Sequence, residues 1–111
     1  MRLRMLLALP ALVLGTLVPT VTAPSADAAS LRAWDRLASC ESGGRWHIAT
    51  GNGYYGGLQF SASTWRGFGG TRYATSAHRA SRIQQIRVAE RVKAQQGWAA
   101  WPVCSRKVGL R

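Results

Sequence analysis

The chain has 111 residues and carries 15 lysines and arginines against four acidic residues, which gives a formal net charge of +11 at pH 7. This charge indicates a polyanionic partner, either nucleic acid or an anionic cell wall. The two cysteines and two histidines form no cluster with zinc-ligand spacing, so we expect neither a metal nor a cofactor.

The first 28 residues have the pattern of a secretory signal peptide. Two arginines precede an almost wholly apolar run over residues 5–18, and Ala26-Asp27-Ala28 supplies a small-x-small cleavage site. Ala23, which a proline follows, is a weaker site. The apolar run is shorter than the ~20 residues that a membrane-spanning helix needs, so we expect export without stable membrane insertion. Residues 29–111 then form one small domain, and export favours the cell wall over nucleic acid.

A first helix is predicted over residues 30–42. Ser30 can act as its N-cap, and apolar residues such as Trp34 and Ala38 recur at helical spacing. The pair Gly43-Gly44 is expected to end the helix.

The following segment, residues 45–60, is rich in glycine, tyrosine and asparagine, which predicts turns around short strands. Asn52-Gly53 is a hairpin signal within it. After this segment, Ser61 or Ser63 can cap a short helix through Trp65.

The clearest helix is predicted over residues 82–96. Ser81 and Gln84 have the spacing of a capping box, in which each side chain binds the other residue's main-chain amide. The predicted apolar face consists of Ile83, Ile86, Ala89 and Val92. On either side of this helix region, we expect residues 71–80 to form a polar connector and residues 105–111 to fray.

Three acidic residues remain after removal of the signal peptide, and Glu41 has the most unusual position. It lies seven residues after Trp34, about 20° short of two helical turns, so it extends the apolar stripe of its helix. Burial and the negative dipole of the last turn both raise the pKa of a carboxyl group, as a general acid requires. The alternative is a helix-end carboxylate without a catalytic role. We expect Asp35 to be solvated and Glu90 to pair with neighbouring arginines, with a second catalytic role as the alternative for Glu90.

The glycine and aromatic segment has two interpretations. In the first it is a small hairpin packed by tyrosines. In the second it lines a sugar-binding groove, where aromatic rings stack on pyranose faces and polar side chains bind hydroxyl or acetamido groups. The stacking candidates are Trp46, Tyr54, Tyr55 and Trp65, and the polar candidates are Asn52, Gln59 and Thr64.

The stretch WDRLASCESGGRWHIATGNGYYGGLQFSASTW, together with IQQIRVAERV and QGWAAWPVC, closely resembles the catalytic domain of the resuscitation-promoting factors. These are exported actinobacterial muralytic enzymes with a lysozyme-like fold. The resemblance covers about residues 31–104, which is nearly the whole predicted mature chain. The expected fold class is therefore α+β and mainly helical: a small lysozyme-like domain with a short β-hairpin region and one disulfide.

The resemblance implies that Glu41 is the single catalytic acid and that Cys40 and Cys104 form the disulfide. Two polar residues that help to line the substrate cleft in the family are present here, Thr64 and Gln96. The chain departs from the family pattern at two positions. Ser61 stands where some members have aspartate, and Arg45 replaces a frequent asparagine.

These features predict a secreted, cell-wall-associated monomer that cleaves peptidoglycan glycan strands. The expected target is the β-1,4 bond between N-acetylmuramic acid and N-acetylglucosamine, cut as by a lytic transglycosylase or a muramidase, in support of wall remodelling, resuscitation and growth. A peptidoglycan endopeptidase is a partner by resemblance alone. The alternative function is a catalytically idle, cationic wall-binding or signalling domain. A nucleic-acid or membrane binder would explain the charge but not the export signal or the glycine and aromatic segment.

Overall fold

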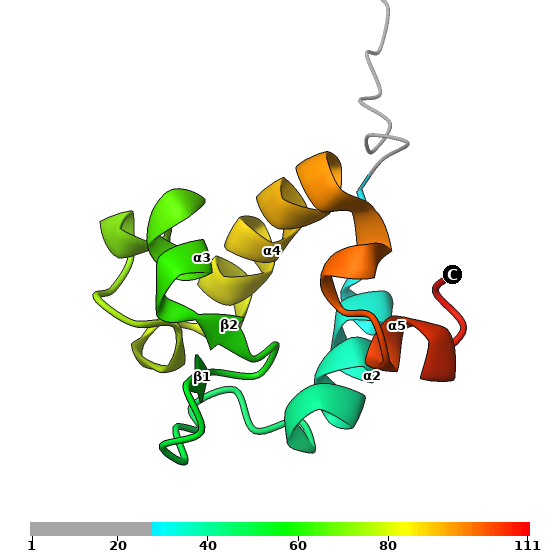
Figure 1. The fold of residues 1–111 in the computed structure, drawn as a ribbon, viewed down its shortest axis with the longest axis horizontal. Coiled ribbons are helices and arrows are strands. Elements are labelled where there is room, and N and C mark those ends of the chain that lie inside the picture. The colour runs from blue at the N-terminus through cyan, green and yellow to red at the C-terminus, as the bar shows by residue number, and fades with distance from the viewer. Residues whose placement is uncertain (1–27) are drawn as a thin grey trace, which may run out of the picture.

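Four α-helices and a two-stranded antiparallel sheet are found in residues 28–111, which are the residues that the computed structural model describes (Figure 1). The helices are α2 (Leu31–Ser42), α3 (Ala62–Gly67), α4 (Arg82–Gln96) and α5 (Cys104–Lys107), and the strands are β1 (Tyr54–Tyr55) and β2 (Phe60–Ser61). This arrangement confirms the expected small, mainly helical domain. The predicted signal peptide lies outside the described residues, apart from its last residue.

Helix α2 begins and ends close to where the sequence predicts. The Ser30 side chain accepts a hydrogen bond from the Ala33 amide at 3.1 Å, which satisfies one free amide of the first turn. At the other end, Gly43 adopts the left-handed conformation, with φ of 69°, and terminates the helix. The buried face of α2 consists of Ala33, Trp34, Leu37, Ala38 and Ser42.

The hairpin turns at a different place from the one that the sequence signal suggested. The register pairs Tyr54 with Ser61 and Tyr55 with Phe60. The turn that connects the two strands is therefore residues 56–59. Asn52-Gly53 lies in the preceding loop, which is closed by an isolated β-bridge between Ala49 and Tyr55. The side-chain oxygen of Asn52 accepts a hydrogen bond from the Tyr54 amide at 2.9 Å, so the motif does form a local turn.

Helix α4 has the predicted capping box. The Ser81 hydroxyl accepts a hydrogen bond from the Gln84 amide at 3.1 Å, and the Gln84 side chain accepts one from the Ser81 amide at 2.9 Å. The predicted apolar face needs correction at two positions. Ile83 is 37% exposed, whereas Gln85 is fully buried because its amide group has hydrogen-bond partners inside the core.

The predicted polar connector, residues 71–80, is more ordered than its composition suggested. It overlaps the first of two 3-10 turns, η3 (Gly70–Arg72), and contains the second, η4 (Ala77–Arg79). Ala77 and Ala80 are each only 1% exposed. The Ala80 carbonyl accepts a hydrogen bond from the Gln85 side chain at 3.1 Å.

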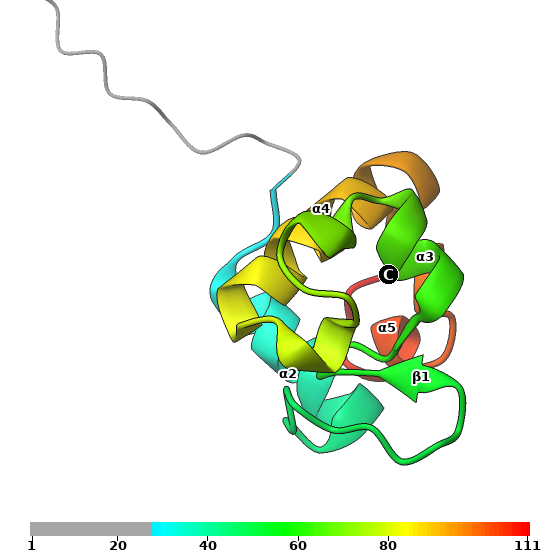
Figure 2. The same cartoon turned by 90° about the vertical axis from the view of Figure 1, so that its left-hand side faces the viewer.

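The C-terminal residues, expected to fray, are instead packed on the domain. Helix α5 lies against α2 (Figure 1 and Figure 2). Ser105 is fully buried, its carbonyl accepts a hydrogen bond from the Leu110 amide at 2.8 Å, and its hydroxyl accepts one from the Arg111 side chain at 2.8 Å. The Arg36 side chain of α2 donates to the Val108 carbonyl. The contact between Arg36 and Val108 joins residues 72 positions apart, so no local pattern in the sequence indicates it.

Tryptophan rings from both ends of the chain meet in the core. The Trp34 ring of α2 lies 4.9 Å from the Trp98 ring and 5.3 Å from the Trp101 ring, measured between centroids. Trp98 belongs to η5 (Gly97–Ala100), the 3-10 turn that follows α4. Because tilted and edge-to-face aromatic pairs are favourable, this cluster joins α2 to the chain that leaves α4.

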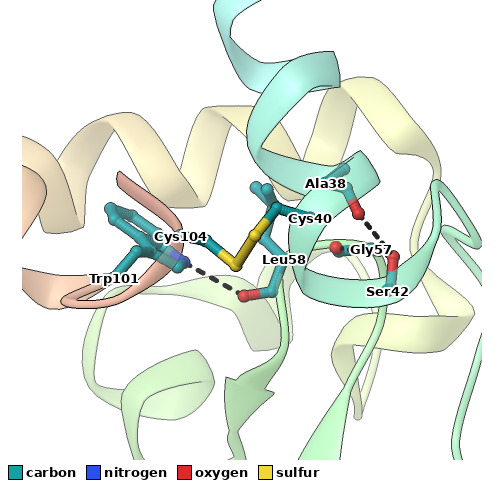
Figure 3. The surroundings of a disulfide bond; sticks show 7 residues. All are labelled: Ala38, Cys40, Ser42, Gly57, Leu58, Trp101 and Cys104. Carbon is teal, nitrogen blue, oxygen red and sulfur yellow. Dashed lines mark hydrogen bonds between the residues drawn. A yellow bond between two sulfur atoms is a disulfide. The ribbon is translucent and has the colours of Figure 1, made fainter. Parts of the chain in front are cut away.

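A disulfide between Cys40 and Cys104 confirms the pairing that the family resemblance implied (Figure 3). It joins the last turn of α2 to the first residue of α5, across a sequence separation of 64 residues. The two segments are therefore held together covalently as well as by packing.

Side chains from distant segments hold the main chain of the hairpin turn. The Ser42 hydroxyl donates to the Gly57 carbonyl at 2.8 Å, and the Trp101 indole donates to the Leu58 carbonyl at 3.0 Å (Figure 3). The Gly57 amide donates to the Gln85 side chain at 2.9 Å. Gly57 has no room for a side chain, because a Cβ atom would lie 2.4 Å from the Trp46 ring. We call Ser42, Gln85 and Trp101, whose side chains bind the main chain of Gly57 and Leu58, the turn clamp.

Replacing both cysteines by alanine should lower the free energy of unfolding by about 4 kcal/mol, because the disulfide closes a long loop in the unfolded chain. Denaturant unfolding of the wild type and of the Cys40→Ala/Cys104→Ala variant measures the difference. Reducing agent should destabilise the wild type to a similar degree and leave the variant unaffected. Equal stability of the two proteins under oxidising conditions would contradict this prediction.

Gln85→Leu should lower the free energy of unfolding by about 2–4 kcal/mol, because it leaves buried main-chain groups without hydrogen-bond partners. These groups are the Gly57 amide and the carbonyls of Trp46 and Ala80. Gln95→Leu, at an exposed position on the same helix, is the matched control and should change stability little. Thermal or urea unfolding of both variants is the measurement, and similar values for the two would show that the buried amide is dispensable.

Candidate active site

Two adjoining hollows form a cleft between the hairpin and the segment that follows α4. They have volumes of about 300 Å³ and 110 Å³ and share Tyr54, Gln59, Ala100 and Trp101 in their walls. The larger hollow is also lined by Glu41, Pro102, Val103 and Cys104. The smaller is also lined by Phe60, Ser61, Thr64, Val92 and Gln96. The cleft therefore brings together five of the predicted site residues: Glu41, Tyr54, Gln59, Thr64 and Gln96.

Glu41 projects into the larger hollow from the last turn of α2. Its side chain is half-buried, and this burial raises the pKa of its carboxyl group above the ordinary value. The negative end of the helix dipole acts in the same direction. Among the described residues, none forms a hydrogen bond or ion pair with this carboxyl group, so nothing there favours its charged form. Such a group can hold a proton at a higher pH than an exposed glutamate.

The other two acidic residues of the domain have structural partners outside the cleft. Asp35 is half-exposed, as expected for a solvated residue, but it also forms a two-pronged ion pair with Arg82, both contacts being 2.8 Å. Glu90 has a structural role, as expected, but its cationic neighbour is Lys93, at 4.0 Å, and not an arginine. Its carboxylate also accepts hydrogen bonds from the Trp34 indole at 2.7 Å and the Ala29 amide at 2.9 Å. Among the described residues, Glu41 is thus the one carboxylate that lines the cleft.

Gln59 enters the cleft from a strained main-chain conformation. Its φ of 58° is in the left-handed region, where the structure places no other described residue except glycines. The side-chain amide donates to the Gly56 carbonyl at 3.1 Å and accepts a hydrogen bond from the Asn52 side chain at 3.2 Å. Asn52 therefore orients Gln59 and is not itself part of the cleft wall.

The two adjacent tyrosines have different environments. Tyr54 is 49% exposed and lines both hollows. Side chains alternate between the two faces of a strand, and Tyr55 lies outside the cleft wall, with its ring stacked on His78 at 5.4 Å between centroids. Tyr54 is therefore available for stacking on a ligand in the cleft, whereas Tyr55 packs against the domain.

Thr64 and Gln96 lie at the far end of the cleft from Glu41, in the smaller hollow. Ser61 caps α3, accepting a hydrogen bond from the Thr64 amide at 3.2 Å, and its hydroxyl also donates to the Thr64 hydroxyl at 2.9 Å. Gln96 is exposed at the end of α4. The two helices thus present a hydroxyl and an amide to the same hollow.

Trp65, predicted to stack on a sugar, is instead part of the core. It is 1% exposed, its indole donates to the Ala74 carbonyl at 2.8 Å, and its ring packs edge-on against Phe60. It therefore cannot contact a ligand in the cleft. Trp46 is half-buried and packs over Gly57, so its role is also structural.

Residues 100–103 form an apolar wall of the larger hollow that we did not predict from the sequence. Within it, Val103 is 62% exposed, an unusual position for a large apolar side chain. A signal for this wall was present in the predicted disulfide. Because Cys104 is bonded to Cys40, the residues just before Cys104 must lie near Glu41, which follows Cys40.

Two negative findings apply to residues 28–111. No group of three histidine, cysteine or acidic side chains is placed so that it could hold a metal ion. Within the same range, every helix is too short or too polar to span a lipid bilayer.

Comparison with known proteins identifies the domain. The family model described as "Transglycosylase-like domain" matches residues 26–104. The chain is 65% identical over 91 residues to resuscitation-promoting factor Rpf1 of Corynebacterium glutamicum, covering 82% of this chain and 47% of that protein. It is 54% identical to resuscitation-promoting factor Rpf of Micrococcus luteus, covering 77% and 37% respectively.

A third relative is resuscitation-promoting factor RpfA of Mycobacterium tuberculosis, at 61% identity over 76% of this chain and 21% of that protein. The chain therefore spans less than half the length of each of these relatives. The matched region nevertheless includes the whole cleft and both cysteines. The chain belongs to the resuscitation-promoting factor family and carries its transglycosylase-like domain.

Proposed function

We propose that this protein is exported and cleaves the β-1,4 bond between N-acetylmuramic acid and N-acetylglucosamine in peptidoglycan. The observation that carries the proposal is the half-buried Glu41, whose carboxyl group has a raised pKa and lines the cleft of a transglycosylase-like domain. Breaking a glycosidic bond requires a carboxylic acid that protonates the leaving oxygen. Glu41 is the residue of the cleft that can supply this proton.

The second half of the reaction must use something other than a second carboxylate. Double-displacement and inverting glycosidases place a second carboxyl group about 5–9.5 Å from the first. In this domain, the two other described carboxylates, Asp35 and Glu90, are paired elsewhere. We propose that the 6-hydroxyl of the muramyl residue attacks its own anomeric carbon, with Glu41, now ionised, accepting the hydroxyl proton. Attack by the substrate's acetamido group or by water is the alternative.

The cleft has contacts suited to a glycan strand. Tyr54 can stack on a sugar ring near Glu41, and the exposed Val103 extends the apolar surface on the opposite wall. Gln59, held in place by Asn52, can bind hydroxyl or acetamido groups. In the adjoining hollow, Thr64 and Gln96 can also bind hydroxyl or acetamido groups of the glycan. The strand then runs along both hollows, with the bond to be cut at the Glu41 end.

The charge and the proposed export are consistent with this substrate. The exported chain lacks Arg2, Arg4 and Asp27, so its formal net charge is +10, which attracts it to an anionic wall at long range. We therefore propose a secreted monomer that acts at the cell wall in growth and resuscitation. A peptidoglycan endopeptidase would open the peptide cross-links of the same strands and is the expected partner enzyme.

Glu41→Gln should keep the fold and lower glycan cleavage by at least about 100-fold, because the amide cannot donate a proton to the leaving oxygen. Release of soluble fragments from purified peptidoglycan, measured beside thermal unfolding, tests this. The variant should be as stable as the wild type or slightly more stable, since a half-buried carboxylate is removed.

Wild-type activity should fall as the pH rises through the raised pKa of Glu41, because the acid form is then lost.

Asp35→Asn is the matched control for Glu41→Gln. It lies on the same helix and makes the same change from acid to amide, but outside the cleft, so cleavage should remain near the wild-type rate. Substantial cleavage by a folded Glu41→Gln protein would remove Glu41 from the mechanism. If the wild type itself binds wall but releases no fragments, the domain is instead an idle wall-binding module.

The released fragments should carry mainly 1,6-anhydromuramyl ends, because an internal hydroxyl is already positioned and has a high effective concentration relative to water. Mass spectrometry of the fragments without chemical reduction distinguishes the two products, since an anhydro end is one water lighter than a reducing end. A hydrolytic muramidase digesting the same wall is the control. A pool dominated by reducing ends would mean that water, held by Gln59, Thr64 or Gln96, is the nucleophile.

A further inference from the structure

The nitrogen of Ala29 is held by a carboxylate from a distant helix. It donates to Oε2 of Glu90 on α4 at 2.9 Å. Ala29 is half-buried and packs against the core, whereas the preceding residue, Ala28, is exposed. The Ala29 nitrogen thus has a carboxylate partner at the peptide bond that the signal-peptide pattern marks for cleavage.

The site around Glu90 suits a positively charged nitrogen. Its Oε2 also accepts a hydrogen bond from the Trp34 indole at 2.7 Å, and its Oε1 lies 4.0 Å from the Lys93 ammonium group. The Glu90 side chain is only 28% exposed, so water solvates its charge incompletely. A main-chain amide offers one donor to such a carboxylate, whereas an α-ammonium group offers three donors and a full charge. The amide hydrogen bond to Glu90 already has one charged partner, and an ammonium group would add the Coulomb attraction of a second, opposite charge.

We infer that cleavage between Ala28 and Ala29 creates an α-ammonium group for which Glu90 is the binding site. A signal peptidase adds water across this peptide bond: the hydroxyl goes to the Ala28 carbonyl carbon and a hydrogen goes to the Ala29 nitrogen. At neutral pH the new acid loses a proton and the new amine gains one. The inference rests on the proposed export and is independent of glycan cleavage.

The resulting ion pair joins the two helices that carry opposite parts of the cleft. Ala29 lies two residues before the start of α2, which bears Glu41 at its other end, and α4 bears Glu90 together with Val92 and Gln96. A positive charge beside the N-terminus of α2 is unfavourable with respect to the helix dipole. The negative charge of Glu90 compensates for this, so the ion pair and the helix are compatible.

The α-amine should have a raised pKa in the folded protein. Among the described residues, the charged groups at this nitrogen are Glu90, which raises the pKa, and Lys93, whose ammonium group lies 4.0 Å from the other oxygen of the same carboxylate and opposes the rise. Glu90 is in direct contact and therefore dominates. Because the folded pKa exceeds the unfolded value of about 8, the ion pair stabilises the protein fully below that pH, and the stabilisation is lost as the pH rises through the folded pKa.

The experiment uses protein secreted with its own signal peptide and collected from culture medium. Its intact mass and N-terminal peptide should show a chain that begins at Ala29. The protein is produced in ¹³C-labelled medium, and the α-amine is titrated by NMR through the ¹³Cβ resonance of Ala29 in native buffer and in urea. The native titration should lie above the ordinary value of about 8, and the urea titration near it.

Two variants identify the partner of the α-amine. Glu90→Gln keeps a hydrogen-bond acceptor for the Trp34 indole but removes the charge, and should bring the native titration down to the value in urea. Asp35→Asn, which removes the carboxylate that pairs with Arg82, should leave it raised. A mature chain that begins at another residue, or a wild-type α-amine that titrates equally in native buffer and in urea, would overturn the inference. Both of these outcomes are read from the wild type and do not depend on the folding of a variant.

Discussion

The disulfide between Cys40 and Cys104 is the constraint on which the cleft depends. Glu41 follows one of these cysteines, and the apolar wall at residues 100–103 precedes the other, so a single covalent bond brings the carboxyl group beside that wall. A domain of this size buries too little surface for its core alone to hold two such distant segments firmly. The covalent link therefore fixes a geometry that packing alone would leave loose.

The opposite wall of the cleft is fixed without covalent bonds. The turn clamp binds the main chain of Gly57 and Leu58 from α2, from α4 and from the segment after η5. Gln59 follows directly, in a left-handed conformation that costs a non-glycine residue on the order of 1 kcal/mol or more. Such strain persists only where the surroundings over-determine the main chain, and three side chains from three distant segments satisfy that condition.

Local signals in the sequence predicted the helices well, because a cap depends on residues three or four apart. Ser30, Gly43 and the Ser81–Gln84 capping box all act as expected. Burial was harder to predict, because it depends on which distant segment covers a side chain. Gln85 lies in the core since its partners come from Gly57, Trp46 and Ala80, and no local pattern indicates them. Trp65 was misplaced for the same reason: the sequence identifies an aromatic ring but not its neighbours.

The distribution of the carboxylates gives the strongest argument about the site. In a chain with 15 lysines and arginines, a glutamate without a cationic partner is unusual. Asp35 of α2 pairs with Arg82 of α4. Glu90 of α4 binds the Trp34 indole of α2 and the Ala29 amide just before α2. An arginine beside Glu41 would stabilise its ionised form, lower its pKa and remove the proton that a general acid must donate. Among the described residues, no cation forms an ion pair with Glu41, the one acidic side chain that lines the cleft, and this is the electrostatic setting that the proposed general acid requires.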